Sequence, residues 1–216
     1  MFVGHYSAAL AAATHPKAPN LGTLFVAAQA MDLGFFTFVL TGAEHMRLTP
    51  GITAMNNMDL YDMPLTHSLV GASVLALLFG LVTGRIVRNA VAGLLAGAVV
   101  VSHWFLDLLV HQPDLTLAGL PPKLGFGLWN HPGIEMPIEI GLLLGSAWLF
   151  ARARQPRTGR LTILLAVLLA FQAFNWFAPQ PTELDASQSI LGLVAYGLAA
   201  LVAWWAVRGD RRVQAT

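Results

Sequence analysis

Two imidazoles and a carboxylate recur at intervals of four residues within one strongly apolar segment. His103, Asp107 and His111 lie in the sequence VVVSHWFLDLLVH at residues 99–111. Four residues of α-helix turn the chain through about 400°, so the three side chains project from one stripe of a helix. Imidazole and carboxylate are ligand types of zinc and similar transition-metal ions. The spacing therefore predicts a metal site, and the alternative is a hydrogen-bonded staple between helices.

The composition places this segment in a membrane protein. The chain has 216 residues, of which 56% are hydrophobic and 11% charged, and its mean hydropathy is +0.64. Soluble domains carry about 25% charged residues. The sequence has no cysteine, which excludes disulfides, iron–sulfur clusters and thiolate zinc sites. Its length allows a single transmembrane domain over residues 1–216, and no nucleic-acid partner is expected, since the net charge of +1 gives no indication of one.

Seven apolar segments alternate with polar turns along the chain. A full span needs about 20 residues, so the first segment is too short to cross alone and the fifth is marginal. Pro137 is expected to open the fifth segment, because proline is tolerated at a helix start. The sequence therefore predicts an all-α fold, a polytopic membrane helix bundle of six spans plus a short N-terminal helix, with long loops at 42–65 and 111–136. The segments are 2–14, 21–41, 66–85, 90–110, 137–152, 161–178 and 188–208.

The distribution of basic residues predicts how the bundle is oriented. If the first short helix starts outside, 10 of the 12 Lys and Arg residues collect on one side, which the positive-inside rule places in the cytoplasm. Arg47 and Lys123 fall on the other side, together with both long loops. Glu44 and His45 are expected at the membrane interface on that side. The N-terminus is then outside and the C-terminus cytoplasmic. The ten residues are Lys17, Arg85, Arg88, Arg152, Arg154, Arg157, Arg160, Arg208, Arg211 and Arg212, and Asp210 is the one acidic residue among them.

Ionisable groups from several segments are expected at one depth of the bundle. With a rise of about 1.5 Å per residue, they fall within a slab about 12 Å thick, with His111 at its outer rim. Asp32 lies in the middle of a span, where a charged side chain costs about 3 kcal/mol unless a cation or a donor compensates it. Of Glu135 and Glu139, we expect one to be functional and the other to face solvent. The groups at this depth are His5, Asp32, His67, His103, Asp107, Glu135 and Glu139.

Five short motifs contain these residues. They are VGHYSAAL, AAQAMDLGF, MPLTHSLVGA, SHWFLDLLVHQPDL and WNHPGIEMPIE. Together they resemble the membrane-bound metal-dependent hydrolase family, whose members include inner-membrane hydrolases related to zinc-dependent phospholipase C. The resemblance covers a metal-site region of about residues 1–145, and a motif-free C-terminal hairpin follows at about 155–210.

The resemblance implies a set of metal ligands. Soluble zinc phospholipases C and related single-strand nucleases have a trinuclear site, and the order of their ligands is similar to the order of the polar residues in this chain. One to three zinc ions, or another divalent metal, are therefore expected. Asp32 would bridge two ions or act as general base, and Glu135 or its rival Glu139 would complete the coordination or shuttle a proton. The implied ligands are His5, Asp32, His67, His103, Asp107, His111, His131 and Glu135.

The function implied by this resemblance is hydrolysis at a membrane. We expect a zinc-dependent hydrolase of the bacterial inner membrane that acts on a lipid-like or phosphoester substrate near the outer face, in contact with membrane lipids. The alternative is a non-catalytic membrane subunit, in which the cluster is a structural metal site or polar staple in a larger complex or a homo-oligomer. Haem bound between His67 and His103 is a third reading, although haem sites rarely surround iron with carboxylates. Alkaline ceramidases are also seven-span zinc hydrolases, but their late-span His ligands have no counterpart in the last two segments.

Overall fold

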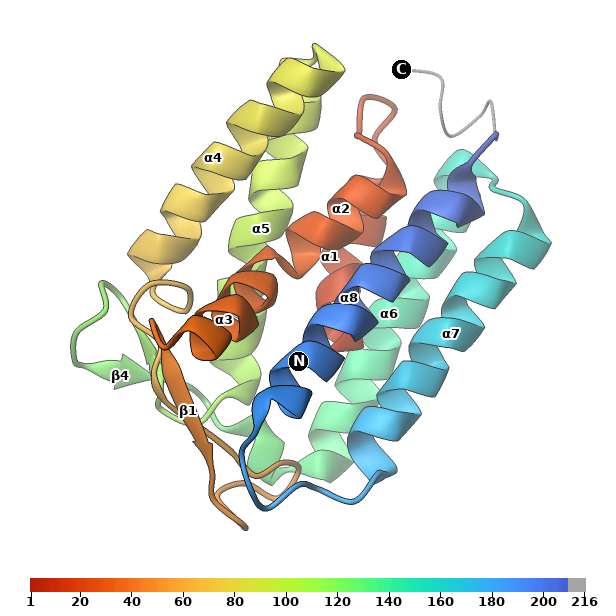
Figure 1. Cartoon of the computed structure of the whole chain (residues 1–216). Coiled ribbons are helices and arrows are strands. Elements are labelled where there is room, and N and C mark those ends of the chain that lie inside the picture. Colours follow the sequence, from red (N-terminus) through yellow and green to blue (C-terminus); the bar gives the residue numbers. More distant parts are fainter. Residues whose placement is uncertain (210–216) are drawn as a thin grey trace.

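The helices of the computed structural model stand side by side and carry two small β-hairpins at one end of the bundle (Figure 1). The structure describes residues 1–209, so Asp210, Arg211 and Arg212 lie outside the described residues. The elements are the 3-10 helices η1 (Val3–His5) and η2 (Leu128–Asn130), the helices α1 (Tyr6–Ala12), α2 (Leu21–Ala28), α3 (Ala30–Thr41), α4 (Leu69–Val87), α5 (Ala90–Val110), α6 (Pro132–Arg154), α7 (Thr158–Phe177) and α8 (Ala186–Val207), and the strands β1 (His45–Leu48), β2 (Met58–Asp62), β3 (Leu115–Thr116) and β4 (Lys123–Leu124).

Long apolar helices make up most of the described chain. The five helices α4 to α8 are each long and apolar enough to cross a membrane, and the bent pair α2 and α3 adds a sixth span if it is counted as one. The short helix α1 packs between α2, α5 and α6, with Tyr6, Ala9 and Leu10 fully buried. This arrangement confirms the predicted all-α polytopic bundle with a short N-terminal helix.

The span formed by α2 and α3 is broken at Gln29. Helices α2 and α3 meet there at an angle of 53°, and the Gln29 side chain is fully buried. A break in a membrane helix frees backbone polar groups, which are tolerated only where the surrounding protein or a cavity satisfies them. The break also places Asp32 in the first turn of α3 rather than in the middle of a continuous helix.

Glycines bring α4 against α5, the helix that carries His103 and Asp107. A Cβ atom on Gly93 would lie 2.4 Å from the carbonyl oxygen of Gly80, and one on Gly97 would lie 2.8 Å from that of Ala76. Small residues at such positions let helix backbones approach closely in membranes. The close packing with α4 therefore fixes where α5 presents its polar stripe.

Helix α6 begins earlier than the sequence predicted. Pro132 occupies its first position, and Pro137 lies inside the helix rather than at its start. The first position needs no intrahelical N–H bond, so Pro132 suits it, whereas Pro137 removes the one bond that its own nitrogen would donate to the Gly133 carbonyl. As a result Glu135 lies on the first turn of a helix and not in a loop.

Both long loops form β-hairpins at the end of the bundle opposite the α4–α5 turn (Figure 1). An isolated bridge joins Ser68, which precedes α4, to Thr116 of β3. At the opposite end three Arg side chains lie over Trp rings, as is typical of a membrane interface. These pairs are Arg152 with Trp148, Arg160 with Trp205 and Arg208 with Trp204. Which end faces the cytoplasm stays a prediction.

Candidate metal centre

Six predicted ligands come together inside the bundle. His5 ends η1, Asp32 lies on α3 and His67 precedes α4, while α5 supplies two residues and the position directly after it supplies the sixth. Five of the side chains are buried, and Asp32 keeps 15% of its side chain exposed. These side chains, which four different parts of the chain contribute, therefore lie close together, while their depth in a membrane stays a prediction. The six residues are His5, Asp32, His67, His103, Asp107 and His111.

The helix α5 presents its stripe as the spacing predicted. The Nε2 atom of His103 lies 2.9 Å from Oδ2 of Asp107, one turn along the helix. The His111 amide donates to the Asp107 carbonyl oxygen at 2.8 Å, so the helical geometry reaches the third residue, whose Nε2 atom lies 3.5 Å from Oδ1 of Asp107. His111 is 3% exposed, so it belongs to the buried cluster rather than to its rim.

Asp107 is the residue around which the other groups gather. Its Oδ1 atom lies 3.0 Å from both the amino group of Met1 and Nε2 of His5. Its Oδ2 atom lies 3.6 Å from Nε2 of His67, in addition to the contact with His103. A buried carboxylate needs compensation by positive charge or donors, and the amino group of Met1 provides a positive charge at Oδ1.

Two sets of three ligand atoms have spacings that could hold a metal ion. One set comprises His5, His103 and Asp107, and the other comprises Asp32, His67 and His103, with the atoms of each set within 4.8 Å of one another. In the second set, Oδ1 of Asp32 lies 3.4 Å from Nε2 of His67 and 3.5 Å from Nε2 of His103. His103 belongs to both sets and therefore lies at the centre of the cluster.

Acceptors outside the cluster fix the orientation of two imidazoles. Nδ1 of His103 lies 2.7 Å from the carbonyl oxygen of Ala28, and Nδ1 of His111 lies 2.8 Å from Oδ1 of Asp114. A carbonyl or carboxylate oxygen only accepts, so the Nδ1 atom carries the proton and Nε2 faces the cluster. Metal-binding histidines have this arrangement, in which the far ring nitrogen donates to a carbonyl or carboxylate.

The break between α2 and α3 supplies one of these acceptors. Ala28 is the last residue of α2, and the carbonyl groups of a final helical turn lack intrahelical partners. His103 donates to that carbonyl oxygen from α5. The bend at Gln29 thus both turns Asp32 toward the cluster and exposes the acceptor that orients His103.

A chain of hydrogen bonds orients His67. The hydroxyl of Thr66 donates to Oε2 of Glu44 at 2.6 Å, and its oxygen lies 2.9 Å from Nδ1 of His67. Because the hydroxyl proton is directed to the carboxylate, its oxygen accepts from Nδ1 of His67, which leaves Nε2 for the cluster. Glu44 is fully buried and also accepts from the backbone N–H groups of Leu65 and Thr66, so its predicted interfacial position is wrong.

The electrostatic surroundings of His111 differ from those of an ordinary surface imidazole. Burial lowers the pKa of His111, but the carboxylates of Asp114 and Asp107 outweigh this effect and raise its pKa to about 9. His111 is therefore protonated at neutral pH. An ion bound at its Nε2 atom would have to displace that proton.

Glu139 holds the start of the chain in place. Its Oε1 atom accepts from the backbone N–H groups of Phe2 at 2.6 Å and Gly4 at 2.9 Å. Its Oε2 atom accepts from Nε2 of Gln172 at 2.9 Å, and the Oε1 atom of Gln172 accepts from the N–H group of Val3 at 3.2 Å. Glu139 therefore binds the segment that ends in His5, and its oxygens are already occupied by these donors.

Glu135 and His131 lie apart from the two ligand sets. Glu135 is fully buried beside Glu139, so the prediction that one of the two glutamates faces solvent is wrong. His131 is exposed where α6 begins, and among the described residues it belongs to neither ligand set. The structure thus does not bring His131 and Glu135 into the cluster, and their role as ligands stays a prediction.

Several residues that support the cluster were not predicted. Asp114 follows His111 by three residues, a spacing that could have indicated the contact. Gln172 and Tyr196 lie on α7 and α8, where no motif was recognised, although a lone polar side chain within an apolar span is itself a signal. The residues that sequence reasoning missed are Glu44, Thr66, Asp114, Gln172 and Tyr196.

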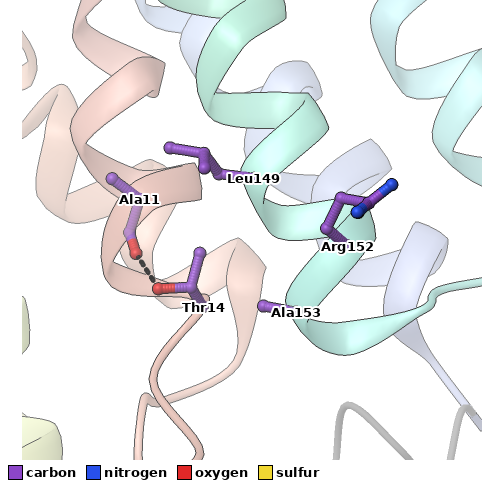
Figure 2. A pocket seen from close by; sticks show the side chains of 5 residues that line it. All are labelled: Ala11, Thr14, Leu149, Arg152 and Ala153. Atoms are coloured by element: carbon purple, nitrogen blue, oxygen red, sulfur yellow. Dashed lines mark hydrogen bonds between the residues drawn. The ribbon is translucent and has the colours of Figure 1, made fainter.

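A shallow groove lies between α1 and α6, away from the cluster (Figure 2). Its volume is about 420 Å³, and the hydroxyl of Thr14 on its wall donates to the Ala11 carbonyl oxygen at 2.7 Å. No His, Asp or Glu side chain lines this groove. The lining residues are Ala11, Thr14, Leu149, Arg152 and Ala153.

No protein-family profile, curated protein or solved structure matches this chain. Fold and site nevertheless define a class. The protein is a helical bundle of the membrane type with a buried His/Asp group that could hold a metal ion.

Proposed function

We propose that this protein is a metal-dependent hydrolase with zinc as its ion and a lipid-like or phosphoester substrate. The observation that carries the proposal is the orientation of three imidazoles. Each directs Nδ1 to an acceptor outside the cluster and Nε2 toward the carboxylates of Asp32 and Asp107. A staple between helices needs no common orientation, whereas a metal ion needs it.

The chemistry of the donor set fits zinc. The Nε2 atoms of His5 and His103 are buried, and neither makes a hydrogen bond within the described residues. Both lie near an oxygen of Asp107, but a short distance without alignment is not a hydrogen bond. The lone pair of His103 Nε2 is thus free for an ion, and nitrogen and oxygen ligands without sulfur suit zinc. Bound zinc would lower the pKa of a coordinated water toward neutrality and polarise a substrate oxygen.

The substrate would approach the cluster from the side on which Asp32 lies. It is the predicted ligand of the cluster with a partly exposed side chain, at 15%. A carboxylate at the open edge can accept a proton from an attacking water, so Asp32 is assigned as general base or as a bridge. Glu135 is assigned to proton transfer, since the oxygens of Glu139 are occupied. A substrate with an apolar tail suits a site enclosed by membrane-type helices.

Metal analysis of the purified, detergent-solubilised protein tests the proposal. We expect at least one equivalent of tightly bound zinc, lost in His103→Ala and retained in His15→Ala, whose imidazole is exposed on the α1–α2 turn. Lipid phosphodiesters, phosphomonoesters, carboxylic esters and amides then form the substrate panel, with turnover expected for at least one class. Absence of tight metal, or equal zinc in both variants, would overturn the proposal.

A second candidate is a non-catalytic membrane subunit with a polar staple. It is favoured by the ion pair between the Met1 amino group and Asp107, which compensates the buried carboxylate without any ion. This candidate predicts that His103→Ala lowers thermal stability by the same amount with and without added zinc. The hydrolase predicts a larger loss when zinc is present, because the ion stabilises only the folded wild type.

A further inference from the structure

The two oxygens of Asp32 have different partners. Oδ1 faces the imidazoles of His67 and His103 at 3.4 and 3.5 Å. Oδ2 accepts a hydrogen bond from the hydroxyl of Tyr196 at 3.0 Å. Tyr196 belongs to α8, more than 160 residues away in the sequence and in the part of the chain where no motif was recognised.

Packing holds the Tyr196 ring in this position. Its centroid lies 5.6 Å from the ring of Phe2 and 6.1 Å from that of Phe36. Phe36 in turn lies on Gly192, one turn before Tyr196, where a Cβ atom would come within 2.7 Å of the Phe36 ring. The direction of the hydroxyl is therefore set by the contact between α3 and α8.

We infer that Tyr196 is a positioning residue for the metal centre: by donating to Oδ2, it holds Asp32 with Oδ1 toward His67 and His103. The inference rests on the proposed function, since it concerns a ligand of the same ion. Asp32 is the cluster ligand with an exposed part, so without the phenol its carboxylate can turn away from the two imidazoles. Removal of such an outer partner typically weakens metal binding 10–100-fold.

Substitution of Tyr196 by Phe isolates the hydroxyl. The Tyr196→Phe variant keeps the ring and its contacts with Phe2 and Phe36, so a tyrosine that only fills space would tolerate it. Tyr61→Phe is the matched control, because it removes the same group from a half-exposed residue of β2. The test uses the full-length protein in detergent, with Co²⁺ as a spectroscopic probe and competition with a chelator to measure zinc affinity.

We expect Tyr196→Phe to bind zinc 10–100-fold more weakly and to change the visible spectrum of bound Co²⁺, while Tyr61→Phe matches the wild type. If the wild type binds the ions and Tyr196→Phe has the same affinity and spectrum, this inference alone fails. If the wild type binds neither ion, the proposed function fails and this inference with it.

A double-mutant comparison separates positioning from a general loss of folding. If Tyr196 acts through Asp32, the change to Phe should have no further effect on zinc affinity in an Asp32→Asn background. Thermal unfolding in the presence of chelator provides the measure of folding for each variant. Additive effects of the two substitutions on zinc affinity would overturn the inference even if each variant binds zinc more weakly.

Discussion

Replacement of Glu139 by alanine tests whether this residue is a ligand or a holder of the chain start. The substitution removes the acceptor of the Phe2 and Gly4 N–H groups and one bond of Gln172. A buried donor left without an acceptor costs about 1–3 kcal/mol, and an ordinary hydrogen bond contributes about 1 kcal/mol. Phe2 is only half-buried, so water can reach its N–H group. We therefore expect a loss of about 3–5 kcal/mol in the free energy of unfolding.

The metal content of the same variant gives the second readout. Residues 2–4 position His5, so the loss of their hydrogen bonds should let His5 move and should weaken zinc binding. Saturating zinc should still fill the site, because the substitution removes no ligand. Equilibrium unfolding and a zinc titration in detergent measure the two effects, and Ile138→Ala, on the exposed neighbouring position of α6, is the control. Unchanged stability together with loss of zinc at saturation would refute this reasoning and make Glu139 a ligand.

Two other substitutions test the hydrogen bond that orients His67 and the close contact between α4 and α5. Thr66→Val removes the hydroxyl that orients His67 and should weaken zinc binding about 10–100-fold. Thr66→Ser keeps a hydroxyl and should restore the zinc affinity. Equal zinc affinity of both variants in a chelator competition would contradict the role of this hydroxyl in orienting His67. Gly93→Ala places a Cβ atom 2.4 Å from the Gly80 carbonyl oxygen and should cost about 1–3 kcal/mol of unfolding free energy, while Gly141→Ala, with open space around it, should add about 0.5–1 kcal/mol. Equal stability of the two glycine variants would show that α4 and α5 can separate at no cost.

The spans and the stripe on α5 could be predicted because a membrane restricts the choices. About 20 apolar residues in a row have few alternatives to a helix, and an interval of four in a helix forces side chains onto one face. The spacing of His103, Asp107 and His111 therefore predicts their proximity, and their contacts in the structure agree with it. The helix rise alone predicted that His5, Asp32 and His67 lie within one slab about 12 Å thick.

The roles of the glutamates could not be predicted because their partners are distant in the sequence. Glu139 accepts from backbone N–H groups 135 and 137 residues away. Every residue except proline has such a group, so the residue types do not indicate which of them a glutamate binds. Glu44 was assigned to an interface because it follows a span, yet the hairpin folds back and buries it against Thr66. The bend at Gln29 also lacks a proline or glycine that would have indicated it.

The two ligand sets are not equally organised. His103 directs a single Nε2 atom to the cluster, and one lone pair binds one ion, so both sets cannot be complete at once. In the set with Asp107, the Met1 amino group already lies on Oδ1, and Nδ1 of His5 has no hydrogen-bond partner within residues 1–209. In the set with Asp32, both imidazoles are held from outside the cluster and the carboxylate is held by Tyr196. An ion entering the second set displaces no amino group and finds each ligand already oriented, so that set is the better prepared of the two.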